Sequence, residues 1–184
     1  MSNPTKSKHL LNFANNKISD MRTRAATVDD IGQIMEIISQ AKAQMRRLGS
    51  GQWTDDYPSH QHIAKDISDG HGYVMTDDDG VVAYMAISFD GEPAYAPLDT
   101  SGEKIPYATA HRLAVADRAK RRGIATALMR EAERIAKEAG ITLLRADTNF
   151  DNAYMLRLFE TLRFTYRGKV VYLSGERLAY EKRL

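Results

Sequence analysis

The amino-acid sequence predicts a single α/β domain, and three observations support this fold class. The chain has 184 residues, 43% of them hydrophobic and 27% charged, which suits one domain with one substantial core. An alternating segment at residues 107–115, a basic turn, an amphipathic segment after Gly123 and an apolar segment at residues 141–146 form a β-α-β unit. Hairpin patterns lie on either side of this unit, at residues 73–88 and 166–182.

The N-terminal part of the chain is expected to contain an extension, a strand and a helix. Residues 1–20 contain lysines and scattered apolar positions without the apolar core of a secretion signal, so we expect a tail or a short helix there. The single domain is therefore placed at residues 21–184, with its first strand at residues 21–25. Thr27 and Asp30 have the spacing of a helix capping box. The apolar residues that follow recur on one face of a helix: Ile31, Ile34, Met35, Ile38 and Ala41.

Turn-forming residues divide the next part of the chain. Glycines and a proline predict a loop at residues 49–58, which is followed by a short helix around residues 60–67. Two strands at residues 73–76 and 81–88 are joined by the turn D-D-D-G. Residues 90–106 contain three prolines and two glycines, so we expect a long connection without a regular element.

The basic turn at residues 118–126, which reads R-A-K-R-R-G-I-A-T, predicts a site for a phosphate group. Gly123 has no side chain to block the backbone, and the first amides of the following helix have no partner within the helix. These amides, the positive end of the helix dipole and the side chains of Lys120, Arg121 and Arg122 together attract an anion. A solvated face is the alternative for the three basic side chains. The glycine spacing is that of neither a P-loop nor a dinucleotide-binding motif.

Two motifs resemble the GCN5-related N-acetyltransferase (GNAT) superfamily. Its acetyl-CoA motif, Q/R-x-x-G-x-G/A, stands here as K-R-R-G-I-A at residues 120–125, with lysine in the first position. Its second motif, N-x-x-A-x-x-L-Y, stands as N-A-Y-M-L-R-L-F at residues 152–159, with Met155 for the small residue and Phe159 for the tyrosine. The longer run at residues 147–164 resembles a bacterial branch of the superfamily that has no assigned substrate.

The resemblance implies both a fold and a function. The expected fold has a mixed, mostly antiparallel sheet that is flanked by helices and splayed between two central parallel strands. The expected function is direct transfer of an acetyl group from acetyl-CoA to a primary amine of a small molecule or peptide, in a ternary complex. Backbone N–H groups at residues 113–115 would face the thioester carbonyl. The residues that the resemblance assigns to the cofactor are Leu113, Ala114, Val115, Lys120, Arg121, Arg122, Gly123, Ile124, Ala125, Thr126, Asn152, Met155 and Phe159.

The strand at residues 107–115 contains a candidate for the catalytic base. His111 lies where many members of the family have a glutamate, on the face expected to carry Leu113 and Val115. An imidazole with a pKa of about 6.5 is suited to remove a proton at neutral pH. We therefore predict that His111 is the catalytic base. A hydrogen-bonded histidine that only lines the cleft is the alternative.

The general acid is missing from its usual position in the family. Phe159 stands where members often have a tyrosine that protonates the departing CoA thiolate, and phenylalanine cannot donate a proton. A thiol with a pKa of about 8.5 can leave unaided, or Tyr154 or another tyrosine can take over the role. The alternative function is an acyl-CoA-binding regulatory module with little catalysis.

Three residues are candidates for the acceptor pocket. Trp53 and Tyr57, in the loop that reads G-Q-W-T-D-D-Y-P, could form its wall, although a lone tryptophan also suits the edge of a core. Asp147 follows the strand at residues 141–146, at the end of the sheet where ligands gather in α/β folds. Asp147 could instead cap the following helix.

The amino-acid composition limits the partners and cofactors that we expect for this protein. A net charge of only +2 argues against a nucleic-acid partner. The absence of cysteine excludes an acetyl-cysteine intermediate and cysteine-ligated zinc, and no other metal site is expected. No segment has the ~20 consecutive apolar residues of a membrane span, so we expect a cytoplasmic enzyme. The sequence does not decide between a monomer and a homodimer.

Overall fold

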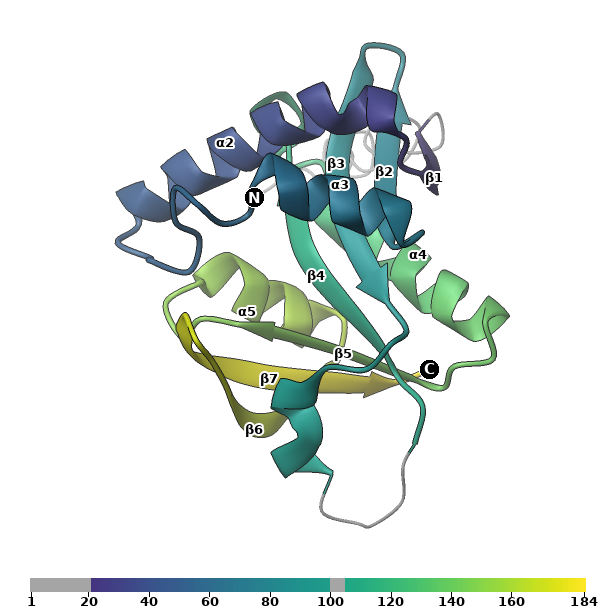
Figure 1. Ribbon diagram of the computed structural model, residues 1–184, viewed down its shortest axis with the longest axis vertical. Helices are drawn as coiled ribbons and strands as arrows, with labels where there is room; N and C mark the ends of the chain where they lie inside the picture. Colours follow the sequence, from purple (N-terminus) through teal and green to yellow (C-terminus); the bar gives the residue numbers. More distant parts are fainter. Residues whose placement is uncertain (1–20, 100–104) are drawn as a thin grey trace, which may run out of the picture.

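The computed structural model of the protein describes residues 21–99 and 105–184 (Figure 1). The predicted extension at residues 1–20 lies outside the described residues. The strands are β1 (Arg22–Ala25), β2 (Gly72–Asp77), β3 (Gly80–Ser88), β4 (Ala108–Val115), β5 (Leu143–Thr148), β6 (Thr165–Tyr172) and β7 (Gly175–Arg183). The α-helices are α2 (Ile31–Arg47), α3 (His60–Ser68), α4 (Ile124–Glu138) and α5 (Ala153–Thr161). Short 3-10 helices lie at η1 (Val28–Asp30), η2 (Pro93–Leu98) and η3 (Asp117–Ala119).

These strands form one mixed sheet, in the order β1-β2-β3-β4-β5-β7-β6. Strands β4 and β5 are parallel, and each of the other neighbouring pairs is antiparallel. Helix α4 connects the two parallel strands, as the β-α-β pattern predicts, and the helices flank the sheet (Figure 1). The predicted fold class is therefore confirmed.

The two parallel strands separate after a short stretch of pairing. Strands β4 and β5 pair from Ala108 with Leu144 to Ala110 with Ala146, and the ladder ends there. Figure 1 shows the two strands diverging from this contact towards the side of the molecule where α5 lies. The expected splay is confirmed, and it leaves the facing edges of two central strands without a strand neighbour.

A β-bulge distorts β4 just beyond the point where it leaves β5. His111 pairs with Ala86, whereas Ala114 pairs with Tyr84 two residues along β3. Three steps along β4 therefore match two steps along β3, which is the definition of a bulge. No pattern of residue types in this strand signals the extra residue.

The bulge changes which side chains share a face of the sheet. Arg112, inside the bulge, has a φ of 55°, which is unusual for a residue with a side chain. Beyond it the alternation is reversed, because Val115 pairs with Ala83 on β3. His111 and Val115 therefore lie on opposite faces of β4, contrary to the prediction from simple alternation.

The core lies between the sheet and its helices. Strand β3 is buried from Val81 to Ile87, which explains its nearly continuous apolar sequence. Helices α2 and α4 are amphipathic, and each buries an apolar face that includes Ile34 and Ile38 on α2 and Leu128 on α4. Within residues 21–99 and 105–184, no helix is long and apolar enough to cross a membrane.

Two local predictions have different outcomes. The capping box is confirmed, because the Asp30 carboxylate accepts hydrogen bonds from the backbone N–H of Thr27 at 2.8 Å and from its hydroxyl at 3.1 Å. The segment at residues 90–106, in contrast, contains η2, although no element was expected there. Tyr95 of η2 is completely buried, so a buried side chain holds this proline-containing turn against the domain.

Candidate active site

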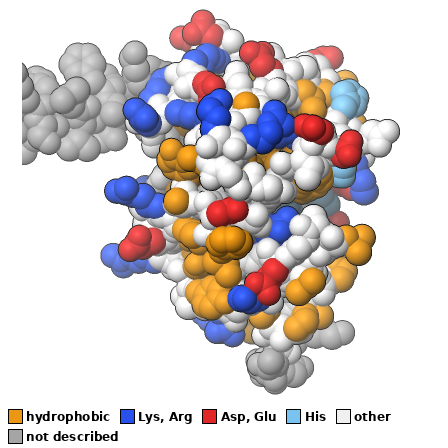
Figure 2. Space-filling model, turned by 90° about the vertical axis from the view of Figure 1, so that its left-hand side faces the viewer, with side chains coloured by type: hydrophobic (Ala, Val, Ile, Leu, Met, Phe, Trp, Pro, Cys, Tyr) orange, Lys and Arg blue, Asp and Glu red, His pale blue; other side chains and the backbone are white. Residues whose placement is uncertain are grey.

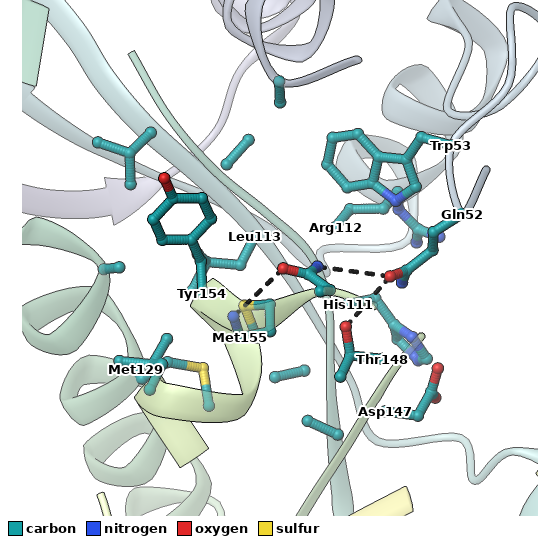
Figure 3. A pocket seen from close by; sticks show the side chains of 18 of the residues that line it. Gln52, Trp53, His111, Arg112, Leu113, Met129, Asp147, Thr148, Tyr154 and Met155 are labelled. Atoms are coloured by element: carbon teal, nitrogen blue, oxygen red, sulfur yellow. Dashed lines mark hydrogen bonds between the residues drawn. The ribbon is translucent and has the colours of Figure 1, made fainter. Parts of the chain in front are cut away.

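A cleft of 1410 Å³ opens where β4 and β5 separate (Figure 3). This volume exceeds that of typical sites for drug-sized ligands, so the cleft has room for a long cofactor and a second substrate. Most of the predicted site residues line it: Trp53, Tyr57, His111, Leu113, Ala114, Val115, Lys120, Arg121, Gly123, Ile124, Ala125, Thr126, Asp147, Asn152 and Met155. Two of the predicted cofactor residues, Arg122 and Phe159, do not.

The N-terminus of α4 forms one end of the cleft. Gly123 is its N-cap residue, with a φ of 78°, and Arg121 has a φ of 60°. Left-handed residues in a turn direct neighbouring backbone N–H groups to one side, where they can bind an anion. The free amides in the first turn of α4 and its dipole act at the same place. The geometry therefore fits the phosphate site that the sequence predicts.

The three basic side chains of the turn have different surroundings. The Lys120 ammonium donates to the side chains of Asp117 and Gln44, so part of its charge is already compensated. Arg121 is exposed and lines the cleft. Arg122 lies outside the cleft, near enough to Asp77 to help hold the pKa of that carboxyl below its usual value. The structure therefore does not support the predicted contact of Arg122 with the cofactor.

We expect Arg121 and Arg122 to contribute unequally to CoA binding. Arg121→Ala should weaken CoA binding roughly three- to tenfold at low ionic strength, because it removes a cation beside the predicted phosphate site. The difference should shrink as salt is added. Arg122→Ala is the matched control and should bind CoA like the parent. Calorimetric titration of both variants at two salt concentrations would check this, and equal losses would contradict it.

Phe159 belongs to the core and not to the cleft. It is completely buried, and its ring centroid lies 5.3 Å from that of Phe164 and 4.7 Å from that of Tyr180. The predicted contact with the cofactor is therefore not supported, because Phe159 lies on the face of α5 that packs on the sheet. Tyr154, at the start of the same helix, is 62% exposed and lines the cleft.

The loop before α3 is tied to the end of β5 by a side chain that sequence patterns did not single out. The Gln52 side-chain oxygen accepts a hydrogen bond from the Thr148 hydroxyl at 3.1 Å (Figure 3). It accepts another from the Asn149 backbone N–H, also at 3.1 Å. Trp53, which follows Gln52, is only 6% exposed and also lines the cleft. Trp53 therefore packs in the core and also forms part of the cleft wall.

The cleft end of β5 bears a half-buried carboxylate. Asp147 does not cap α5, because Asn152 does so by accepting a hydrogen bond from the backbone N–H of Met155 at 3.3 Å. The Asp147 carboxylate instead accepts hydrogen bonds from the hydroxyls of Tyr95 and Tyr172, each at 2.9 Å. Burial raises the pKa of Asp147, although the two hydrogen bonds oppose this shift.

A largely buried ion pair joins the bulge in β4 to α3. Arg112 donates two hydrogen bonds to the Asp66 carboxylate and a third, of 3.1 Å, to the Tyr57 hydroxyl. Asp66 also accepts a hydrogen bond of 2.6 Å from the buried Tyr84 hydroxyl. No sequence pattern reveals this network, because its members lie far apart in the chain and form no local motif.

His111 lines the cleft, but its surroundings differ from those expected of a base. Burial lowers its pKa to about 3, and the neighbouring Arg112 and His71 contribute to this shift. The predicted pKa of about 6.5 is therefore too high. A neutral imidazole can form hydrogen bonds to a substrate, but one with so low a pKa holds a proton only weakly.

No group of three or more His, Asp or Glu residues in the described part of the chain could hold a metal ion.

Comparisons with known proteins agree with this geometry. The model of the acetyltransferase (GNAT) family matches residues 37–164. No curated protein matches the chain in sequence. A GNAT-family acetyltransferase from Streptococcus agalactiae is 30% identical, with 89% of this chain and 95% of that chain covered and a TM-score of 0.79.

Two more distant structures share the fold. A GNAT-family acetyltransferase from Listeria monocytogenes is 18% identical, with a TM-score of 0.72 over 89% of this chain and 95% of that chain. The ribosomal-protein-S18-alanine N-acetyltransferase from Escherichia coli is 14% identical, with a TM-score of 0.60 over 89% of this chain and 93% of that chain. Since the family model spans most of the domain and the streptococcal enzyme matches nearly all of it, the chain belongs to the GNAT family of acetyltransferases.

Proposed function

We propose that this acetyltransferase moves an acetyl group from acetyl-CoA directly to a primary amine of a small molecule or peptide, with both substrates bound at once. The observation that carries the proposal is one continuous cleft that joins the N-terminus of α4 to an end lined by carboxylates. An anionic donor suits the first end and a cationic amine the second.

The splayed edge of β4 supports the binding of the donor between these two ends. Beyond Ala110, β4 has no strand partner on its β5 side, so its backbone groups there form no inter-strand hydrogen bonds to β5. Fixed N–H groups stabilise an oxyanion without having to reorient, which is what attack on a thioester carbonyl requires. The residues of this edge, Leu113 to Val115, line the cleft.

The opposite end of the cleft supports an amine acceptor. In Figure 3, His111 and Asp147 lie at the end marked by Thr148, whereas Tyr154 and Met129 lie at the other end. Direct transfer is favoured because the chain has no cysteine that could carry the acetyl group.

Apolar side chains at the rim of the cleft add contacts beyond those at its two ends. Leu48, Tyr154 and Leu173 line the cleft and are each more than half exposed. On the face shown in Figure 2, hydrophobic side chains gather in the lower part, while basic and acidic side chains are interspersed above them. A rim of this kind suits the carbon chain of an amine or the side chains of a peptide.

The proposal is tested by free thiol release from acetyl-CoA with a panel of amines, using alcohols of matched size as controls. We expect release only with amines, and intersecting initial-velocity plots, because both substrates must be bound before transfer. Parallel plots would contradict direct transfer. Tight CoA binding without turnover on any amine would instead support an acyl-CoA-binding regulatory module.

A further inference from the structure

We propose that Glu92 is the catalytic base that takes a proton from the acceptor amine, and that Asp147 holds the amine beside it as a second carboxylate. This inference rests on the proposed function and names the groups that would act on the amine. Neither a family motif nor a strand pattern points to Glu92, because it lies in the segment where no regular element was expected.

The structure fixes Glu92 at the cleft through its backbone. Its N–H donates to the Tyr107 hydroxyl at 2.9 Å, and this hydroxyl donates in turn to the Glu92 carbonyl oxygen at 3.3 Å. Because both bonds use main-chain atoms, the Glu92 side chain remains available to the cleft that it lines. Glu92 is also the N-cap residue of η2, so the position of that helix determines where the carboxylate lies.

Helix η2 is itself anchored to the strand that carries Asp147. The buried Tyr95 of η2 donates its hydroxyl hydrogen to the Asp147 carboxylate at 2.9 Å. Asp99, just after η2, pairs with Arg145 on β5, whose guanidinium also lies 4.1 Å from the centre of the Tyr107 ring. These contacts bring Glu92 and Asp147 to the same end of the cleft, although 54 positions separate them in the chain.

The charges around Glu92 favour a proton acceptor. Burial raises the pKa of Glu92, and the negative charge of Asp147 adds to the rise, whereas a hydrogen bond from the backbone N–H of Ala94 and the charge of Arg112 oppose it. Arg112 is already engaged by Asp66 and Tyr57, so its charge is partly compensated. The titratable groups close enough to interact electrostatically with Glu92 are Asp147 on β5, Arg112 on β4, Tyr95 on η2 and Tyr172 on β6.

Other titratable groups of the cleft are less suited to this role. Asp66 is committed to Arg112 and Tyr84, and Asp147 accepts two tyrosine hydroxyls. His111 has a pKa lowered to about 3. Glu92, in contrast, forms no ion pair with any described residue.

The proposed step balances as follows. The ammonium nitrogen loses one proton, which frees the lone pair that attacks the acetyl carbon, and it loses the second proton as the carbon–nitrogen bond forms and the carbon–sulfur bond breaks. One proton passes to the Glu92 carboxylate, and the other ends on the departing thiolate to give free CoA. The nitrogen becomes more acidic as it bonds to the carbonyl carbon, so a carboxylate with a raised pKa can accept its proton.

The test compares the pH dependence of kcat/KM for the best amine in the full-length parent and in three variants. Glu92→Gln should lower kcat/KM by ~10² to 10⁴ and remove the acidic limb of the profile, with CoA affinity unchanged. Glu92→Asp should keep the acidic limb of the profile but lower kcat/KM. Glu160→Gln, an exposed residue on α5 outside the cleft, is the matched control and should keep the parental profile.

Asp147→Asn provides a second measurement. If Asp147 had only a structural role, the substitution would not change the pH profile in the way expected here. It should raise KM for the amine and shift the acidic limb to lower pH, because Glu92 loses a neighbouring negative charge. Parental kcat/KM and an unchanged limb in folded, CoA-binding Glu92→Gln would overturn the inference and leave the proposed function intact. A parent that acetylates no amine would overturn both.

Discussion

Replacing Asp66 with alanine is expected to destabilise the protein by about 3–5 kcal/mol, because it breaks a buried ion pair by removing one partner. The Arg112 guanidinium would stay buried without its counter-ion, and the Tyr84 hydroxyl would lose its acceptor. The large loss of stability comes from leaving these two groups unpaired in the interior and not from the net strength of the ion pair. Urea denaturation followed by circular dichroism would measure the change.

Two further variants make this prediction specific. Asp69→Ala removes the partner of Lys65 in an exposed pair at the end of the same helix, and it should change stability little. Combining Asp66→Leu with Arg112→Met removes both charges, so the double variant should recover much of the loss. If Asp66→Ala were as stable as Asp69→Ala, the pair would not be the tether between α3 and the bulge.

Gly123→Val is expected to weaken CoA binding roughly tenfold to a hundredfold. Valine at a φ of 78° costs about 1–3 kcal/mol of backbone strain, and relief of that strain would turn the first amides of α4 away from the phosphate site. Isothermal titration with CoA would give the affinity.

The chain offers a control with the same backbone conformation far from the cleft. Gly140, just after the other end of α4, has a φ of 76° and open space around it. Gly140→Val should therefore lower the thermal midpoint by a similar strain while leaving CoA affinity unchanged. Equal CoA affinities in the two variants would contradict a phosphate site at Gly123.

The proposed donor half of the cleft was largely predictable from sequence. A strand, a basic turn with Gly123 and an amphipathic helix follow one another in the chain, so local patterns describe a site that is itself local. What these patterns missed is the bulge around Arg112, because hydrogen-bond register depends on the partner strand β3 and not on the residue types of β4.

The acceptor half was less predictable for a physical reason. Glu92 lies in a proline-containing segment whose position depends on a buried tyrosine and on an ion pair with β5. Gln52 and Asp66 acquire their partners only when the chain has folded. For Phe159 the motif position was misleading, because the same position on a helix can face either a cleft or a core.

The two ends of the cleft also differ in how the chain encodes them, and this has a consequence for how such enzymes diversify. The proposed donor end comes mainly from one continuous stretch, residues 112–126, whereas the proposed acceptor end is assembled from separate segments, which include the connections that carry Trp53 and Glu92 and the end of β5 that carries Asp147. Surface connections accept insertions and replacements more readily than strands do. A lineage can therefore exchange acceptor-binding segments one at a time while its cofactor chemistry is inherited intact. Grafting such connections between relatives is accordingly a practical route to a new amine specificity on this scaffold.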